Sequence, residues 1–132
     1  MELLFVVDPL EDLKAYKDSS VAMMREAASR GHAVWACLPG DMAWTAGGVA
    51  AETQHLAVSD DDHEWHQVEE QAHRHLAGFG AVLMRKDPPF DLEYLYSTHL
   101  LELAEGEGAR VVNSPRALRD YNEKLAIAKF SE

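Results

Sequence analysis

The hydrophobic pattern of the chain starts with short, unbroken apolar runs. Residues 3–7 are all apolar and the run stops at Asp8. Similar runs cover residues 33–38 and 81–84, and a shorter one, Val111-Val112, follows Arg110 within residues 110–112. Runs of this length are typical of strands buried on both faces of a parallel sheet. We therefore predict four strands over these ranges, with the first one central.

A helix is predicted between the first two strands, over residues 19–30. Val21, Met24 and Ala28 recur at helical spacing, which gives the helix an apolar face. Residues 18–20 are Asp-Ser-Ser, all good N-cap residues, and Gly31 supplies the stop. The helix should therefore pack its apolar side on the sheet.

A second helix is predicted over residues 92–105, with Asp91 as its N-cap and Gly106 and Gly108 at its end. Phe90 and Leu95 have the spacing of a hydrophobic staple. His99 lies on the predicted inner face, so we interpret it as a packed histidine rather than a base. The residues expected to face the core are Leu92, Leu95, Tyr96, His99 and Leu103.

The middle of the chain has a different pattern. Residues 42–46 and 49–58 flank Gly47-Gly48, a turn signal that predicts a hairpin. Residues 60–76 fit a helix, with Trp65, Val68, Ala72 and Leu76 in phase, but residues 65–71 also fit a strand that pairs with the hairpin. The pattern alone leaves both alternatives open.

The order of the elements predicts the fold class. It reads strand–helix–strand, an insert, then strand–helix–strand–helix, with short helices expected over residues 115–119 and from Asn122. This order favours an open, mainly parallel α/β sheet with flanking helices and an inserted hairpin. Ligands of such sheets bind outside the carboxyl ends of the strands. The loops expected there, over residues 8–20, 85–91 and 113–114, carry Lys14, Lys17, Arg85 and Lys86.

The composition of the chain argues against several classes of protein and partner. The chain has 132 residues, which favours one domain, and its formal net charge is −11 with no basic face, which argues against nucleic acid or an anionic membrane as a partner. No apolar run approaches the roughly 20 residues of a membrane span, and MELLFVVD is too short and too soon acidic for a signal peptide. Cys37 is the single cysteine, so no internal disulfide can form, and it is expected to be a buried strand residue rather than a nucleophile. In an acidic chain, the scarce cations at the ligand edge predict an anionic ligand.

Two motifs carry that prediction, each with a plainer alternative. Residues 17–20 open the first helix, where free N–H groups and serine hydroxyls can bind an anion, although ordinary capping would explain them equally well. In MRKDPPFD, Arg85 ends a strand and can grip a carboxylate through two parallel hydrogen bonds, with Pro88-Pro89 limiting the loop. The alternative is a surface ion pair of Arg85 with Asp87 or Asp91.

The sequence gives little support for a metal site, a nucleotide-binding loop or a catalytic nucleophile. His63 and His66 would share a face of a helix, but no Cys or second histidine pair at a familiar spacing supports a metal site. Asp60-Asp61-Asp62 is most simply a solvated loop. The chain contains neither GxGxxG nor GxxxxGK[ST], and no nucleophile–base arrangement stands out. The sequence thus predicts an edge of the sheet that binds a ligand, but no evident catalytic residues.

Five segments together resemble the amino-terminal part of bacterial glutathione synthetase, an ATP-grasp ligase: VVDP, KDSSVAM, VLMRKDPPFDLEYLY, VVNSPRALRDYNEKL and AKFSE. The resemblance implies a Rossmann-like pre-ATP-grasp domain over residues 1–121 and the start of the ATP-grasp region over residues 122–132. It implies that the full enzyme is cytoplasmic and homo-oligomeric. That enzyme would join γ-glutamylcysteine to glycine, using ATP and Mg²⁺, through an acyl phosphate. The chain would then be a fragment, with no cofactor and no ligase activity of its own.

The resemblance also implies roles for individual residues. Lys124, in NEKL, matches a lysine that reaches the nucleotide, and no residue is assigned to catalysis or to a metal. The resemblance favours a strand over residues 65–71. It assigns no role to the histidines at 63, 66, 73 and 75. The residues that match motifs facing the peptide substrate are Lys17, Asp18, Ser19, Ser20, Arg85, Lys86 and Asp87. Two other hypotheses stay open: a free-standing module that binds a small anion, and an interaction domain that dimerises through the exposed hairpin edge.

Overall fold

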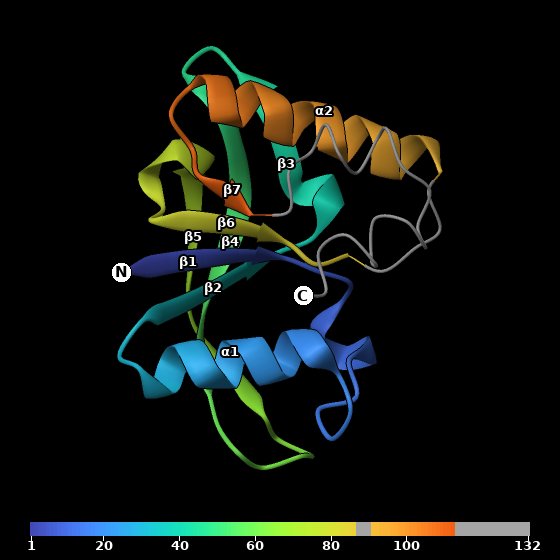
Figure 1. Ribbon diagram of the computed structural model, residues 1–132, viewed down its shortest axis with the longest axis vertical. Coiled ribbons are helices and arrows are strands. Elements are labelled where there is room, and N and C mark those ends of the chain that lie inside the picture. The colour runs from blue at the N-terminus through green and yellow to red at the C-terminus, as the bar shows by residue number, and fades with distance from the viewer. Residues whose placement is uncertain (87–90, 113–132) are drawn as a thin grey trace.

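One mixed sheet with a helix on each face forms the centre of the molecule (Figure 1). The computed structural model describes residues 1–86 and 91–112. The helices are α1 (Ser19–Ser29) and α2 (Leu92–Gly106), and short 3₁₀ turns cover Leu10–Asp12, Pro39–Asp41 and Leu76–Gly78. The strands are β1 (Glu2–Val6), β2 (Ala33–Cys37), β3 (Met42–Thr45), β4 (Gly48–Val58), β5 (His66–His75), β6 (Ala81–Met84) and β7 (Val111–Val112).

The parallel part of the sheet has the order β2-β1-β6-β7. Leu4 of β1 lies in register with Trp35 of β2 and Val82 of β6, so β1 is central as predicted. The predicted strands are confirmed to within one residue at each end, and the α/β class is confirmed with them. All four strands run the same way, so their carboxyl ends meet at one edge, on the right in Figure 1.

The core has two layers because side chains alternate along each strand. Leu4 and Val6 of β1 belong to the cluster beneath α2, whereas Phe5 and Val7 belong to the cluster beneath α1. All four are at most 1% exposed. Full burial of such side chains contributes about 1.5–3 kcal/mol each. An uninterrupted apolar run is what a strand covered on both faces requires, and this is why the sequence pattern identified β1.

The inserted hairpin differs from the prediction by one residue. Gly48 pairs with Thr45, so the turn consists of Ala46 and Gly47 rather than Gly47-Gly48. Gly48 has a φ of 120°, a conformation that side chains disfavour. The Thr45 hydroxyl donates to the Gly48 carbonyl at 2.7 Å, and the Glu107 carboxylate accepts from the Val49 N–H at 2.8 Å. These contacts fix the register, and the one from Glu107, 58 residues away from Val49, could not be seen in the local pattern.

The ambiguous segment between residues 60 and 76 contains a strand rather than a helix. β5 is antiparallel to β4 along most of its length, from Ala50 opposite His75 to Val58 opposite His66. The prediction of a strand over residues 65–71 is therefore confirmed, although the strand is longer. Because His63 and His66 do not lie on a helix, the spacing that suggested a shared face does not apply.

The predicted inner face of α2 is wrong. Leu92 is 83% exposed and Tyr96 is 60% exposed, and His99 is exposed rather than packed. The face that packs on the sheet consists of Tyr94, Ser97, Thr98, Leu100, Leu101 and Ala104. α2 is apolar on both sides, so periodicity did not define one face.

Two polar residues explain why that face was overlooked. Ser97 donates to the Glu93 carbonyl at 3.0 Å and Thr98 donates to the Leu95 carbonyl at 2.7 Å. Their hydroxyls are satisfied within the helix, so their burial leaves no hydrogen bond unmade. Small side chains then let the helix lie close to the sheet.

Several predictions fall outside the described residues: Pro88-Pro89, the contribution of Phe90 to a staple, and the helices over residues 115–119 and from Asn122. The Asp91 N-cap is confirmed, since its carboxylate accepts from the Tyr94 N–H at 2.8 Å. Within residues 1–86 and 91–112, no helix combines the length and apolar character needed to cross a membrane.

Candidate functional site at the carboxyl edge of the sheet

The candidate site lies where β1, β2 and β6 end (Figure 1). Three segments meet there: the loop after β1 with the start of α1, the turn after β2, and residues 85–86 after β6. The Arg85 N–H donates to the Val6 carbonyl at 2.8 Å, which extends the β1–β6 ladder by one step. The backbone of Arg85 is therefore held by the sheet, and its side chain starts from a fixed position.

Arg85 reaches across to the first turn of α1. Its Nη2 donates to the Ser19 hydroxyl at 3.0 Å, and its Nε lies 3.5 Å from the Ser20 hydroxyl. We call these three residues the arginine–serine cluster. No carboxylate of the described residues pairs with Arg85. In particular, Asp91 caps α2 instead, so the structure gives no support to a surface ion pair between Arg85 and Asp91.

The electrostatics of the cluster favour an anion. A guanidinium beside the N-terminus of a helix puts two positive potentials together, because the helix dipole is positive at that end. Asp18 compensates partly: its carboxylate accepts from the N–H groups of Ser20 at 2.7 Å and Val21 at 3.0 Å. Asp18 therefore acts as the N-cap, as the plainer alternative proposed. The planar fork of Arg85 keeps donors for a carboxylate that would complete the arrangement.

The two lysines of these motifs behave differently. Lys86 Nζ lies 3.1 Å from Asp8 Oδ1, and both side chains are largely buried, at 17% and 25% exposed. This pair ties the end of β6 to the end of β1. Lys17 is exposed, with Nζ 5.8 Å from the ring centre of Tyr16, and Lys14 is also exposed. The structure thus joins Arg85 to Ser19 and Ser20, and does not bring Lys17 into that cluster.

Two predicted site residues, Asp87 and Lys124, lie outside the described residues. Across residues 1–86 and 91–112, no group of three or more His, Cys, Asp or Glu side chains is placed to hold a metal ion. The described residues thus offer no fit for Mg²⁺, and the only residue predicted to bind nucleotide is not among them.

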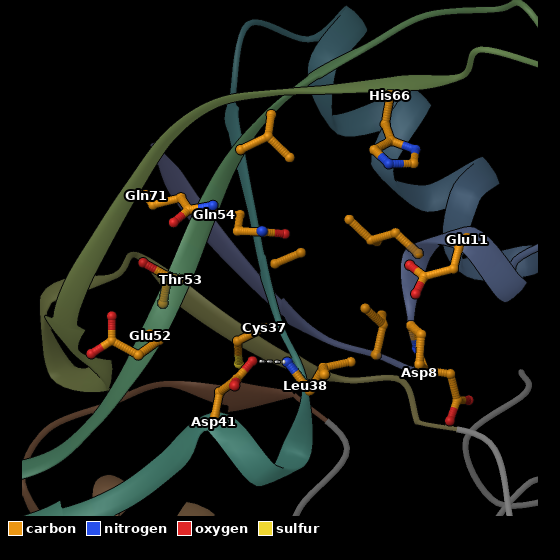
Figure 2. Close-up of a pocket in the computed structure, with 15 residues that line it drawn as sticks. Asp8, Glu11, Cys37, Leu38, Asp41, Glu52, Thr53, Gln54, His66 and Gln71 are labelled. Carbon is orange, nitrogen blue, oxygen red and sulfur yellow. Dashed lines mark hydrogen bonds between the residues drawn. The ribbon is translucent and has the colours of Figure 1, made fainter.

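A cavity of about 460 Å³ opens near the ends of β1 and β2 (Figure 2). It lies between the Leu10–Asp12 turn, the end of β2 and the β4–β5 ribbon. Asp8 lines this cavity and also binds Lys86, so the cavity adjoins the pair of Lys86 with Asp8. The lining residues are Val7, Asp8, Pro9, Leu10, Glu11, Ala36, Cys37, Leu38, Asp41, Glu52, Thr53, Gln54, His66, Val68 and Gln71.

Two titratable groups of the cavity are perturbed by burial. Burial, together with nearby Asp41, raises the pKa of the Cys37 thiol, so that Cys37 is protonated at neutral pH and is not an activated nucleophile. This agrees with the predicted buried strand residue. Burial also lowers the pKa of His66, with Glu11 acting in the opposite direction. His66 is therefore mostly neutral near pH 7.

The sequence comparisons identify the family of the chain. A family model described as "Prokaryotic glutathione synthetase, N-terminal domain" matches residues 1–119. The chain belongs to this family. It is 52% identical over 132 residues to the glutathione synthetase of Ralstonia nicotianae, and 53% identical over 133 residues to that of Nitrosomonas europaea. A more distant relative, the glutathione synthetase of Parasynechococcus marenigrum, is 46% identical over 131 residues.

The chain covers only part of each relative. The matches take in 98% to 100% of the chain but 41% to 42% of the length of those three synthetases. The domain described here therefore corresponds to the amino-terminal two-fifths of such an enzyme. The resemblance inferred from the motifs is confirmed at the level of the family.

Sequence reasoning missed some residues of the site. Asp8 could have been found, because it ends a predicted strand at the same edge as Arg85. Glu11, Gln54 and His66 could not, because their convergence depends on the register of β4 with β5 and on the path of the loop after β1. No local signal in the sequence marks them.

Proposed function

We propose that this chain is the amino-terminal, substrate-binding part of a glutathione synthetase. The full enzyme, by this proposal, is cytoplasmic and ligates γ-glutamylcysteine to glycine. ATP and Mg²⁺ would supply the activation of the carboxylate as an acyl phosphate. Membership of the family supports the general activity, and the assignment of substrates and cofactors rests on that membership.

The observation that carries the proposal is the arginine–serine cluster. Arg85 is held by the sheet, is hydrogen-bonded to neutral hydroxyls and has no carboxylate partner among the described residues. A dipeptide with two carboxylates matches a guanidinium that retains free donors, because a planar fork binds a carboxylate bidentately. In this proposal Arg85 binds a carboxylate of the substrate, and Ser19 and Ser20 orient the guanidinium.

The remaining candidates have narrower proposed roles. Asp18 holds the start of α1 in place by capping it, and Lys86 holds β6 against β1 through Asp8. Lys17 adds positive charge beside the cluster. Asp87 and Lys124 keep the substrate-binding and nucleotide-binding roles that the family motifs imply. Residues 1–121 would form the substrate-binding domain and residues 122–132 would begin the ATP-grasp region.

We propose in addition that the chain alone forms no glutathione, since the nucleotide and metal would be bound by the part of the relatives that it does not cover. A chimera tests both halves of the proposal. Residues 1–132 replace the matching segment of the Ralstonia nicotianae enzyme, with which they share 52% identity. We expect ATP-dependent glutathione formation from γ-glutamylcysteine and glycine by the chimera, and none by the chain alone.

A second measurement distinguishes a failure of the proposal from a chimera that is inactive because it misfolds. Isotope-labelled chain is titrated with γ-glutamylcysteine, and the Arg85 side-chain and Ser19 amide resonances are followed by NMR. Shifts that saturate would support the binding role. A folded but inactive chimera, together with unchanged Arg85 and Ser19 resonances, would refute the proposal.

A further inference from the structure

The cavity near the ends of β1 and β2 has a charge character opposite to that of the arginine–serine cluster. Its lining contains four carboxylates and neither lysine nor arginine. Low-dielectric walls concentrate the field of such groups inside a cavity. A ligand of this cavity is therefore cationic, in contrast to the anion expected at Arg85.

Three of the four carboxylates are already engaged. Asp8 pairs with Lys86 at 3.1 Å, Asp41 accepts from the Leu38 N–H at 2.8 Å, and Glu52 lies 2.6 Å from His73 Nδ1. Glu11 has no hydrogen bond or ion pair with any described residue. Figure 2 shows its carboxylate turned toward the cavity. Glu11 is thus the counter-ion that the cavity can offer.

Two further polar residues, Gln54 and His66, line the same space. The Gln54 side chain is half-buried on β4 and has no partner among the described residues. His66 Nδ1 is buried and likewise lacks a partner within residues 1–86 and 91–112. Both side chains face the centre of the cavity in Figure 2. His66 Nδ1 has almost no accessible surface, so of these groups the Gln54 amide is the one that a ligand in the cavity can reach.

The number of uncommitted carboxylates and the volume of the cavity indicate which kind of cation it could bind. A single uncommitted carboxylate is too few for a metal ion, and no group of three or more His, Cys, Asp or Glu side chains is placed for one in the described part of the chain. The volume of about 460 Å³ exceeds the size of a bare ion and suits a small organic molecule. Val7, Leu10, Ala36 and Val68 would contact its carbon atoms.

We propose that this cavity binds a small organic molecule through its primary ammonium group. Glu11 acts as the counter-ion, and Gln54 Oε1 accepts a second ammonium proton. The proposal stands apart from the ligase activity, because it depends on the cavity and not on Arg85.

The probe is glycinamide, which carries an ammonium and an amide but no carboxylate, and its control is N-acetylglycinamide, which lacks the charge. The Gln54 side-chain amide and the His66 ring of the chain are followed by NMR during titration near pH 7. We expect saturable shifts with glycinamide only. Glu11→Gln should weaken binding about tenfold, as expected for a charge-assisted hydrogen bond.

Matched variants separate binding from a general loss of negative charge. Glu70→Gln removes the same charge from an exposed position of β5 that does not line the cavity, and should bind glycinamide as the wild type does. Gln54→Ala should weaken binding while the melting temperature confirms that the chain is folded. Equal shifts with both probes, or unchanged binding by a folded Glu11→Gln variant, would overturn the proposal.

A competition experiment identifies the source of the ammonium group. If γ-glutamylcysteine displaces glycinamide, the cavity holds the amino end of a peptide. If both bind together, the cavity serves a separate amine. Either result supports the ammonium site. Displacement of glycinamide by γ-glutamylcysteine should be lost in Glu11→Gln but kept in Glu70→Gln.

Discussion

Two arginines at opposite edges of the same sheet show how differently one residue type can be used. Arg74, near the end of β5, lies at the amino edge of the parallel strands. It makes two hydrogen bonds of 2.9 Å to the Glu2 carboxylate, and its guanidinium carbon lies 4.0 Å from the ring centre of Phe79 and 4.8 Å from that of Trp35. Arg85, at the carboxyl edge, contacts only serine hydroxyls among the described residues.

The difference separates a structural arginine from one that we propose binds a ligand. The fork of Arg74 is filled by a carboxylate of the same chain and its faces are covered by aromatic rings, so it has little left for a ligand. Arg85 is equally well anchored through its backbone, but no carboxylate among the described residues occupies its donors. Arg25, Arg30 and Arg74 each pair with a carboxylate, so the contact of Arg85 with neutral hydroxyls alone among the described residues favours an external anion. Four predictions test this distinction.

The largest expected effect is on catalysis. In a full-length enzyme that carries this domain, Arg85→Ala should weaken use of γ-glutamylcysteine by about 2–4 kcal/mol, the cost of breaking a desolvated charge pair. This corresponds to a loss in kcat/KM of about 30- to 1000-fold. Steady-state kinetics with the dipeptide as the varied substrate measure it.

The controls for Arg85 lie in the same assays. Arg85→Lys should recover only part of the loss, because lysine keeps the charge without the fork. The KM for ATP and the melting temperature should change little. A lowered melting temperature with near wild-type dipeptide kinetics would show that Arg85 is structural and that the contrast with Arg74 is wrong.

Arg74→Ala should show the converse behaviour. Losing the bidentate pair and the aromatic contacts should lower the free energy of unfolding of the chain by about 2 kcal/mol. Urea denaturation measures it, and binding of γ-glutamylcysteine to the folded variant should be unchanged. Arg30→Ala is the matched control, since Arg30 forms an exposed pair with Glu26 and should cost less than about 0.5 kcal/mol.

Ser19→Ala should have a smaller effect on the same site. It removes the 3.0 Å hydrogen bond that orients the Arg85 guanidinium, and a loss of about 1 kcal/mol predicts a fall in dipeptide kcat/KM of about fivefold. Ser29→Ala, at the other end of α1, removes a hydroxyl whose partner among the described residues is the Glu26 carbonyl. If both substitutions changed kcat/KM equally, Ser19 would have no specific role in orienting Arg85.

The smallest expected effect is on the pH dependence of the free energy of unfolding, and it comes from the ion pair between Arg74 and Glu2. The hydrogen bonds from Arg74 lower the pKa of Glu2 below its ordinary value of 4.5, with burial opposing. Glu2 is therefore more readily ionised in the folded chain than in the unfolded one. Its contribution to stability is complete above pH 4.5 and is lost as the pH falls through the folded pKa.

Urea denaturation at neutral pH and at steps below pH 4.5, for wild type and Arg74→Ala, isolates this contribution from that of the other carboxylates. The gap in stability between the two proteins should narrow as the pH falls. A constant gap would mean that the ion pair adds nothing and that Arg74 acts only through its aromatic neighbours.

The sequence by itself determined the strands of the parallel sheet, the two helices with their N-caps, and the edge where Arg85 and Ser19 would meet. These features depend on local rules. A strand covered on both faces needs an unbroken apolar run, an N-cap needs an Asp or Ser at one position, and parallel strands share a carboxyl edge. The motifs VVDP and KDSSVAM, and the described parts of VLMRKDPPFDLEYLY, lie on the same elements, so the resemblance could be recognised before any contact was known.

Only the tertiary structure decided which face of α2 is buried, the register of the hairpin, and the grouping of Glu11, Gln54 and His66 around one cavity. Each depends on contacts between residues far apart in the chain. α2 is apolar on two sides, so the position of the sheet selects the buried one, with Ser97 and Thr98 satisfied within the helix. The hairpin register is held by Glu107, which is 58 residues away from Val49. Local patterns carry no information about such partners, because packing chooses them only after the elements have formed.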